Sequence, residues 1–154
     1  MGGKQIQNSR EGIEDILKFF DPRFSGHPEY FEKLQVWQDE RARSCFGTIP
    51  VLMTSFGSCK GRNYQQAVKG LTFPMYTMYE LHSELQKSPR LGPEDIDNYK
   101  NTKQALFDGD TKKIETAIPA LCALLYKHYG VMPYILLDEY DTPLLEAYTD
   151  GYWD

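Results

Sequence analysis

The stretch that decides the fold is PYILLDEYDTPLLEAY, residues 133–148. Within it, the uncharged residues 134–137 end directly on Asp138 and Glu139, and Asp141 follows two residues later. A short apolar run of this kind is typical of a strand buried in a parallel sheet. Such a strand can simply leave the core for a polar turn, or it can hold carboxylates rigidly at its end. We therefore expect a buried strand at 134–137 with an acidic end.

A second apolar, β-branched run, TIPVLMTSF at 48–56, is bounded by glycines and predicts an earlier buried strand. Apolar residues at helical spacing predict helices at about 13–20, 63–87, 94–107 and 111–129, with a kink or break at Pro74, and a helix or helical turn over 28–37. Two strands separated by so long a helical connection cannot form a hairpin, and a helical crossover places them in parallel. The fold class is therefore α/β, with Asp138 at the carboxyl end of a strand, where open α/β sheets build ligand sites.

Composition limits the classes of protein that remain. The chain has 154 residues, 41% of them hydrophobic, which suits one soluble globular unit. A net charge of -5 gives no basic surface and disfavours direct contact with nucleic acid. No apolar run is long enough to cross a membrane, and the start of the chain lacks a signal-peptide pattern. Three scattered cysteines, Cys45, Cys59 and Cys122, favour a reducing, cytoplasmic setting.

The apolar strand that ends in Asp138 and Glu139 has the form of a Walker B motif. In that motif the first carboxylate holds a magnesium ion, and the second polarises the water that attacks the terminal phosphate of a nucleotide. A strand fixed in a sheet supplies the rigidity that this chemistry requires.

The surrounding residues resemble the AAA-ATPase-like family of bacterial proteins. The specific part is ILLDEYDTPLLEAYTDGYWD (135–154), and YFEKLQVWQ (30–38), FGTIPVLMTSF (46–56) and HYGVMPYILLDEYD (128–141) resemble the same family in the same order. Proteins of that family carry a P-loop nucleotide-binding domain, often followed by a nuclease-like PD-(D/E)XK domain. The resemblance covers the chain from about Phe19 onward.

The resemblance implies a partial P-loop NTPase-like domain of the AAA type. Asp138 would be the magnesium ligand and Glu139 the catalytic glutamate, while Tyr140 and Asp141 match family positions without an assigned role. ATP and Mg²⁺ would be the cofactors of the complete domain, and a nuclease-like domain further along the full-length protein would be a possible partner.

The sequence departs from the family pattern at its start. The family begins with a phosphate-binding loop of the type Arg-Arg-Phe-Gly-Lys-Ser, but residues 4–12 read KQIQNSREG, and no Gly-Lys-Ser or Gly-Lys-Thr occurs anywhere. The family also continues into a further strand with a polar sensor residue. We therefore expect residues 1–154 to be an internal part of one AAA-ATPase-like domain, without the Walker A region and the segment after Walker B. ATP hydrolysis is then expected of the complete protein and not of this chain alone.

Two alternatives remain open for the acidic strand end. In the first, the chain is a nucleotide-independent protein-interaction module on the same scaffold, and Asp138 and Glu139 are only a charged strand end. In the second, these acids and Asp141 form a metal nuclease centre. That centre also requires a lysine soon after the acids, and residues 140–146 contain none.

Two other groups of residues have simpler interpretations. The loop Phe56 to Arg62 carries glycines and two cations, but its spacing does not fit a phosphate-binding loop, so we expect an ordinary connection in which Cys59 is exposed. Tyr76, Tyr79 and His82 could form an aromatic surface for a partner, but their spacing favours packing in the core.

Overall fold

The computed structural model describes residues 3–151, with side chains from Glu11 onward. Two strands, β1 (Val51–Ser55) and β2 (Tyr134–Asp138), pair in parallel, with Val51 opposite Tyr134 and Ser55 opposite Asp138. The expected parallel pair is confirmed. The α-helices in the described residues are α1 (Gly3–Phe20), α2 (Gln35–Gln38), α3 (Glu40–Ser44), α4 (Tyr64–Gly70), α5 (Thr72–Glu80), α6 (Pro93–Phe107), α7 (Ile114–Tyr129) and α8 (Thr142–Thr149).

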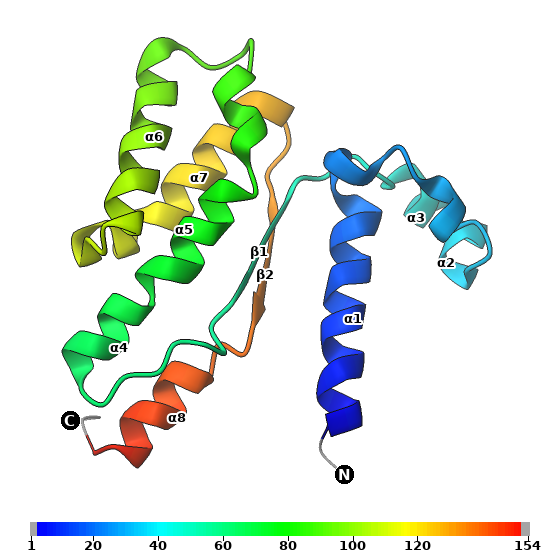
Figure 1. The fold of residues 1–154 in the computed structure, drawn as a ribbon. Helices are drawn as coiled ribbons and strands as arrows, with labels where there is room; N and C mark the ends of the chain where they lie inside the picture. Colours follow the sequence, from blue (N-terminus) through cyan, green and yellow to red (C-terminus); the bar gives the residue numbers. More distant parts are fainter. Residues whose placement is uncertain (1–2, 152–154) are drawn as a thin grey trace.

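Helices α4 to α7 form the connection between the two strands and gather on one side of them, whereas α1 to α3 lie on the other side (Figure 1). Helix α5 packs against β1 and against both α6 and α7. The main core lies between these elements, and its buried members are Leu52, Phe56, Cys59, Met75, Met78, Tyr79, Leu85, Leu91, Tyr99, Leu106, Ala117, Leu121, Cys122, Leu124 and Leu125. No member of this cluster comes from β2.

Strand β2 is not the buried strand that its sequence predicts. Tyr134, Ile135 and Leu137 are 47%, 45% and 42% exposed, although Val51 and Leu52 on β1 are completely buried. The sheet of the described residues contains only these two strands, so β2 is an edge strand with one neighbour. Strand β2 therefore has the apolar composition of a central strand but lies at the edge of the sheet.

The helical stretch 63–87 divides into α4, α5 and a 3₁₀ helix at Ser83–Lys87. The break falls at Leu71, so the expected break at Pro74 is wrong. Pro74 lies in the first turn of α5, where a residue without an N–H group loses no helical hydrogen bond.

The predicted helix at 111–129 is confirmed with a 3₁₀ start. The Asp110 side chain accepts a hydrogen bond from the Lys112 N–H and begins the 3₁₀ turn that leads into α7. Gly130, with a φ of +76°, ends α7 in the left-handed conformation that glycine adopts without strain. Helix α6 matches the helix expected at 94–107 within one residue.

The region after Pro28, where a helix or a helical turn is expected, contains a 3₁₀ turn at Pro28–Tyr30 and the short α2. Helix α3 follows in the polar stretch 38–44, for which the apolar pattern predicts no helix. Its start is explained by Asp39, whose side chain accepts hydrogen bonds from the N–H groups of Arg41 and Ala42. Phe19, at the end of α1, contacts Phe31 and Phe46 in edge-to-face geometry and closes a second, aromatic cluster.

None of the helices in residues 3–151 combines the length and the apolar composition that crossing a membrane requires.

Candidate functional site

The two acids of the Walker B-like sequence lie at the carboxyl end of β2, as expected. Asp138 is the last residue of the strand and stands opposite Ser55, the last residue of β1. Glu139 follows with a φ of +50°, which makes it the single non-glycine residue of positive φ in the described part of the chain. The side chains of both acids are half-buried. Their position is confirmed, and their roles stay predictions.

The side chain of Glu139 turns towards β1. Its Oε2 atom lies 3.1 Å from Ser55 Oγ, and Ser55 Oγ lies 3.3 Å from the Gly57 nitrogen. The Glu139 carboxylate also packs directly over the Gly57 Cα, because a β-carbon built at that position would stand 1.6 Å from Glu139 Oε2. At this point the two strand ends are also joined by a hydrogen bond of 3.0 Å from the Phe56 N–H to the Asp138 carbonyl.

A pocket of about 530 Å³ opens beside the Glu139 carboxylate. Its walls come from the end of β1, the loop that follows it and one face of α5. The lining residues are Met53, Thr54, Ser55, Gly57, Ser58, Phe73, Pro74, Thr77, Leu81 and Glu139. Glu139 is therefore the carboxylate that this pocket presents, and hydroxyl groups of serine and threonine stand around it.

A family model described as predicted AAA-ATPase matches residues 13–153, which is most of the chain and includes both strands and the acidic strand end. The chain belongs to this predicted AAA-ATPase family. No curated protein and no solved structure matches it.

The next two residues of this AAA-ATPase-like chain, Tyr140 and Asp141, lie at the turn into α8. Tyr140 is exposed, and Asp141 precedes the first turn of the helix, where its carbonyl accepts hydrogen bonds from the N–H groups of Leu144 and Leu145. The sequence pattern alone does not predict α8. Among the side chains described, those of residues 11–151, His, Cys, Asp and Glu form no group of three suited to a metal ion.

The loop Phe56 to Arg62 connects β1 to α4, as expected, but its cysteine is not exposed. Cys59 is completely buried, and its Sγ lies 3.5 Å from the Gly70 carbonyl. Burial raises the pKa of the Cys59 thiol. A reactive thiolate is therefore disfavoured at this position. The expectation of an exposed thiol is wrong because the loop folds back over the start of the crossover.

Tyr76, Tyr79 and His82 pack in or against the core, as their spacing predicts. Tyr79 and His82 are almost completely buried, and Tyr76 is half-buried against Phe107. Tyr79 Oη donates to the Ala117 carbonyl over 2.8 Å, which joins α5 to α7.

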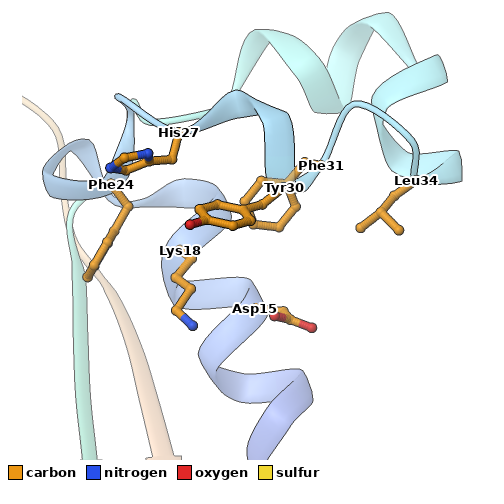
Figure 2. A pocket seen from close by; sticks show the side chains of 7 residues that line it. All are labelled: Asp15, Lys18, Phe24, His27, Tyr30, Phe31 and Leu34. Carbon is orange, nitrogen blue, oxygen red and sulfur yellow. The ribbon is translucent and has the colours of Figure 1, made fainter.

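A pocket of about 620 Å³, larger than the one beside Glu139, lies elsewhere in the AAA-ATPase-like chain. Figure 2 shows it between α1 and the turns that follow, lined by Asp15, Lys18, Phe24, His27, Tyr30, Phe31 and Leu34. It shares no residue with the acidic strand end, and its rings present apolar faces beside one acid and one lysine. Size alone therefore does not make this pocket the candidate site.

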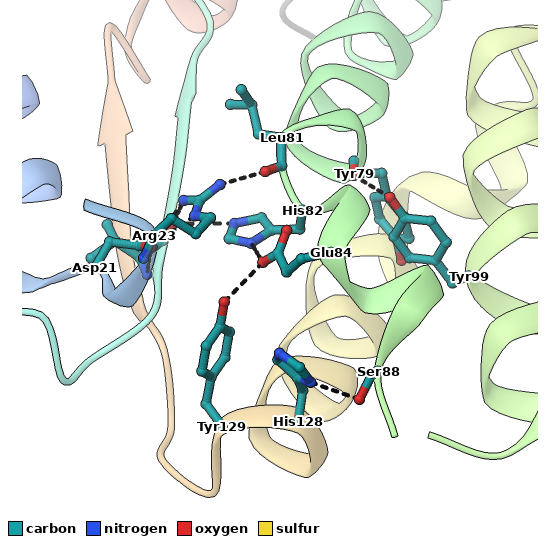
Figure 3. Close-up of polar contacts among 11 residues, drawn as sticks. Asp21, Arg23, Tyr79, Leu81, His82, Glu84, Ser88, Tyr99, His128 and Tyr129 are labelled. Atoms are coloured by element: carbon teal, nitrogen blue, oxygen red, sulfur yellow. Dashed lines mark hydrogen bonds and ion pairs between the residues drawn. The ribbon is translucent and has the colours of Figure 1, made fainter. Parts of the chain in front are cut away.

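A buried polar network lies at the opposite, amino-terminal end of β1 (Figure 3). The Asp21 carboxylate is fully buried and accepts a hydrogen bond of 2.7 Å from the Val51 N–H. Arg23 forms an ion pair of 2.7 Å with Asp21 and also donates to the Leu81 carbonyl. These contacts tie the segment after α1 both to β1 and to the end of α5.

His82 completes this network with contacts at both ring nitrogens. Its Nε2 lies 3.2 Å from the Val51 carbonyl, and its Nδ1 lies 3.0 Å from Glu84 Oε1. Both partners are acceptors, so the imidazole satisfies them together when both nitrogens carry protons. Tyr129, at the end of α7, donates to the same Glu84 oxygen over 3.1 Å. The His82 ring and the Glu84 carboxylate therefore join β1, the 3₁₀ turn after α5, and α7.

We expect Glu84 to contribute stability that disappears in acid. Burial raises the pKa of Glu84, but the hydrogen bond and charge of His82 outweigh burial, so the net pKa lies below its ordinary value. A carboxyl group with a lowered folded-state pKa stabilises the fold above its unfolded-state pKa and loses that contribution as the pH falls through the folded-state value. Denaturant unfolding of Glu84→Gln and the parent chain should therefore differ at about pH 6. The difference should shrink as the pH falls below 4.5, the ordinary pKa of a glutamate. A difference that persists in acid would contradict this role.

Proposed function

We propose that the chain supplies the metal-binding and catalytic acids of an ATP-hydrolysing site, with Asp138 as the ligand of Mg²⁺ and Glu139 as the residue that polarises the attacking water. The observation that supports the proposal is the pair of half-buried carboxylates at a strand end in a chain of the predicted AAA-ATPase family, with Glu139 lining a pocket. A P-loop NTPase fold is part of this proposal.

The residues fit magnesium better than they fit the nucleotide. Mg²⁺ prefers oxygen ligands and commonly takes only one or two carboxylates from the protein, keeping water and phosphate oxygens for its other positions. The half-buried Asp138 meets that requirement. The phosphate-binding loop of a nucleotide site is not matched, because the sequence contains no Gly-Lys-Ser or Gly-Lys-Thr. When bound, the metal would neutralise charge on the phosphates, and this chain's own part is to hold the two acids at the strand end.

We further propose that residues 1–154 form an internal part of one nucleotide-binding domain. Strand β2 supports this, since three of its five side chains are apolar and more than 40% exposed, on both faces of the strand. Side chains with that composition are normally covered by neighbouring elements of an α/β sheet.

Binding of Mn²⁺ tests the assignment of Asp138. Mn²⁺ takes the same oxygen ligands as Mg²⁺ and broadens the nuclear magnetic resonance signals of nearby nuclei. We expect the backbone amide signals of Ser55, Gly57, Asp138 and Glu139 to broaden selectively, and excess Mg²⁺ to restore them. Asp138→Asn should abolish the effect.

Asp141→Asn is the matched control, because it removes an acid three residues away and should leave the broadening unchanged. Broadening that follows Asp141, or that spreads evenly over the acidic surface, would contradict the assignment. It would favour the second candidate, an interaction module in which the acids are only a charged strand end. The exposed apolar side chains of β2 and α8 are the observation in favour of that candidate.

A further inference from the structure

A small apolar groove lies between α4 and α8 and shares no lining residue with the pocket beside Glu139. The two helices contact each other here, and Figure 1 shows α8 beside α4. The groove has a volume of about 270 Å³, and its walls are aliphatic side chains and the ring of Tyr64. Sites for small-molecule ligands usually measure about 300–1,000 Å³ and carry a few polar groups, so this groove is better suited to side chains of a protein.

The end of α8 directs the residues that follow it towards this groove. Helix α8 ends at Thr149, Asp150 is its C-cap, and Gly151 follows with a φ of +72°. When a left-handed glycine ends a helix in this way, the residue after the glycine commonly packs against the side chain three positions before the C-cap. That side chain is Ala147, which lines the groove.

The three residues after Gly151 have the length and the chemistry to fill the groove. They are Tyr152, Trp153 and Asp154, and they lie outside the described residues. A helix rises about 6 Å between Ala147 and Gly151, and two further residues in extended conformation reach about 7 Å. An aromatic side chain can remove about 150–250 Å² from water, so two of them next to an apolar groove supply a driving force for docking.

The charges beside the groove also suit these residues. Lys60 and Arg62 are exposed and come just before α4, and Lys60 Nζ lies 3.7 Å from Glu146 Oε1 on α8. Asp154, the acid that follows the two aromatic residues, is complementary in charge to this basic edge.

We propose that Tyr152 and Trp153 dock in the groove between α4 and α8 and fasten α8 to the first helix of the crossover. Helix α8 begins three residues after Glu139, so this docking anchors the segment that leaves the acidic strand end. The docking needs neither a metal nor a nucleotide, and its test is therefore independent of the function proposed above.

The fluorescence of Trp153 tests the docking in the full chain. The sequence contains two tryptophans, and Trp37→Phe keeps a ring beside Phe46 while it leaves Trp153 as the single reporter. We expect Trp153 to emit at a shorter wavelength, and to be quenched by acrylamide several-fold less, than it is in the same chain unfolded in urea.

Two variants made in this background should release Trp153 from opposite walls of the groove. Leu144→Gln changes α8 and Tyr64→Ser changes α4, and both side chains are at least half exposed, so the variants should fold. Each should raise the quenching of Trp153 several-fold and shift its emission to longer wavelength. Leu145→Gln and Tyr148→Ser are the matched controls, because these exposed residues of α8 do not line the groove, and both readings should stay unchanged.

Three results would overturn the proposal. Trp153 could be quenched as freely in the parent background as in Leu144→Gln, which would mean that nothing docks. Protection could be lost in Leu145→Gln instead, which would place the aromatic residues on the other face of α8. Protection could also fall on dilution, which would assign the groove to a second copy of the chain. Nuclear Overhauser effects from the Trp153 ring to the Ala67 and Ala147 methyl groups, kept when labelled chains are mixed with unlabelled ones, would support docking within one chain.

Discussion

Asp21→Ala is expected to lower the free energy of unfolding by about 3–5 kcal/mol, the usual cost of removing one partner from a buried ion pair. The Asp21 side chain is completely buried and binds the Val51 N–H at 2.7 Å. Arg23 approaches the same carboxylate from Nε and from a terminal nitrogen, at 2.7 and 2.8 Å. Alanine would leave a buried N–H group without an acceptor and a partly buried guanidinium without its counter-charge. Urea unfolding followed by circular dichroism measures the loss.

Asp39→Ala is the control for Asp21→Ala. Asp39 also accepts two backbone hydrogen bonds, but it is an exposed helix cap, so its loss should cost about 0.5–2 kcal/mol. Asp21→Asn keeps an oxygen for the Val51 N–H and should fall between the two. Equal losses for Asp21→Ala and Asp39→Ala would show that the segment after α1 is not anchored through this carboxylate.

Tyr79→Ala is expected to cost about 3–5 kcal/mol, as for other buried aromatic side chains reduced to alanine. Tyr79 is completely buried, its ring lies 5.5 Å from that of Tyr99, and its hydroxyl binds the Ala117 carbonyl. It joins α5 to both α6 and α7, and α5 is the helix that supports one wall of the Glu139 pocket. The loss should therefore appear both in the unfolding free energy and in the amide signals around Glu139.

Tyr79→Phe separates the hydroxyl from the ring. It removes one hydrogen bond to the Ala117 carbonyl, which keeps its helical donor in α7, and should cost about 0.5–1.5 kcal/mol. Tyr126→Ala is the matched control, because Tyr126 lies on α7 with half of its surface exposed and should change stability by no more than about 0.5 kcal/mol. A large loss in Tyr126→Ala would mean that the apolar surface of α7 matters beyond this core.

Much of the fold can be predicted from local patterns. Strand β1, the parallel pairing, α6 and α7 all follow from apolar spacing and from the glycines and prolines around them. The position of Asp138 and Glu139 follows as well, because a strand that stops on charge places the charge at its end. Pro74 shows the limit of such patterns. Proline marks either a break or the first turn of a helix, and the apolar spacing around it is the same in both cases.

The features that local patterns miss depend on partners distant in the sequence. The exposure of Ile135 and Leu137 depends on which elements pack against β2, and the composition of the strand itself does not reveal this. Burial of Cys59 depends on the approach of Gly70. The contact between Ser55 and Glu139 follows only when the strand register is known, since a shift by one residue would turn the Ser55 side chain to the other face. A serine and a glycine just after an apolar strand are the available signal, and many ordinary connections share it.

The separation of the two strands along the chain sets the order in which the site can assemble. Ser55 and Glu139 are 84 residues apart, and every helix of the crossover lies between them. Closing so long a loop costs conformational entropy. Strand β2 contributes no residue to the main core, so its burial offsets little of that cost. The helices and β1 hold the core through contacts that are closer in sequence, so we expect them to collapse first and the pairing of β2 to come late. The acids are thus brought together with Ser55 and Gly57 only as folding is completed, and a nascent or partly folded chain would carry no assembled site.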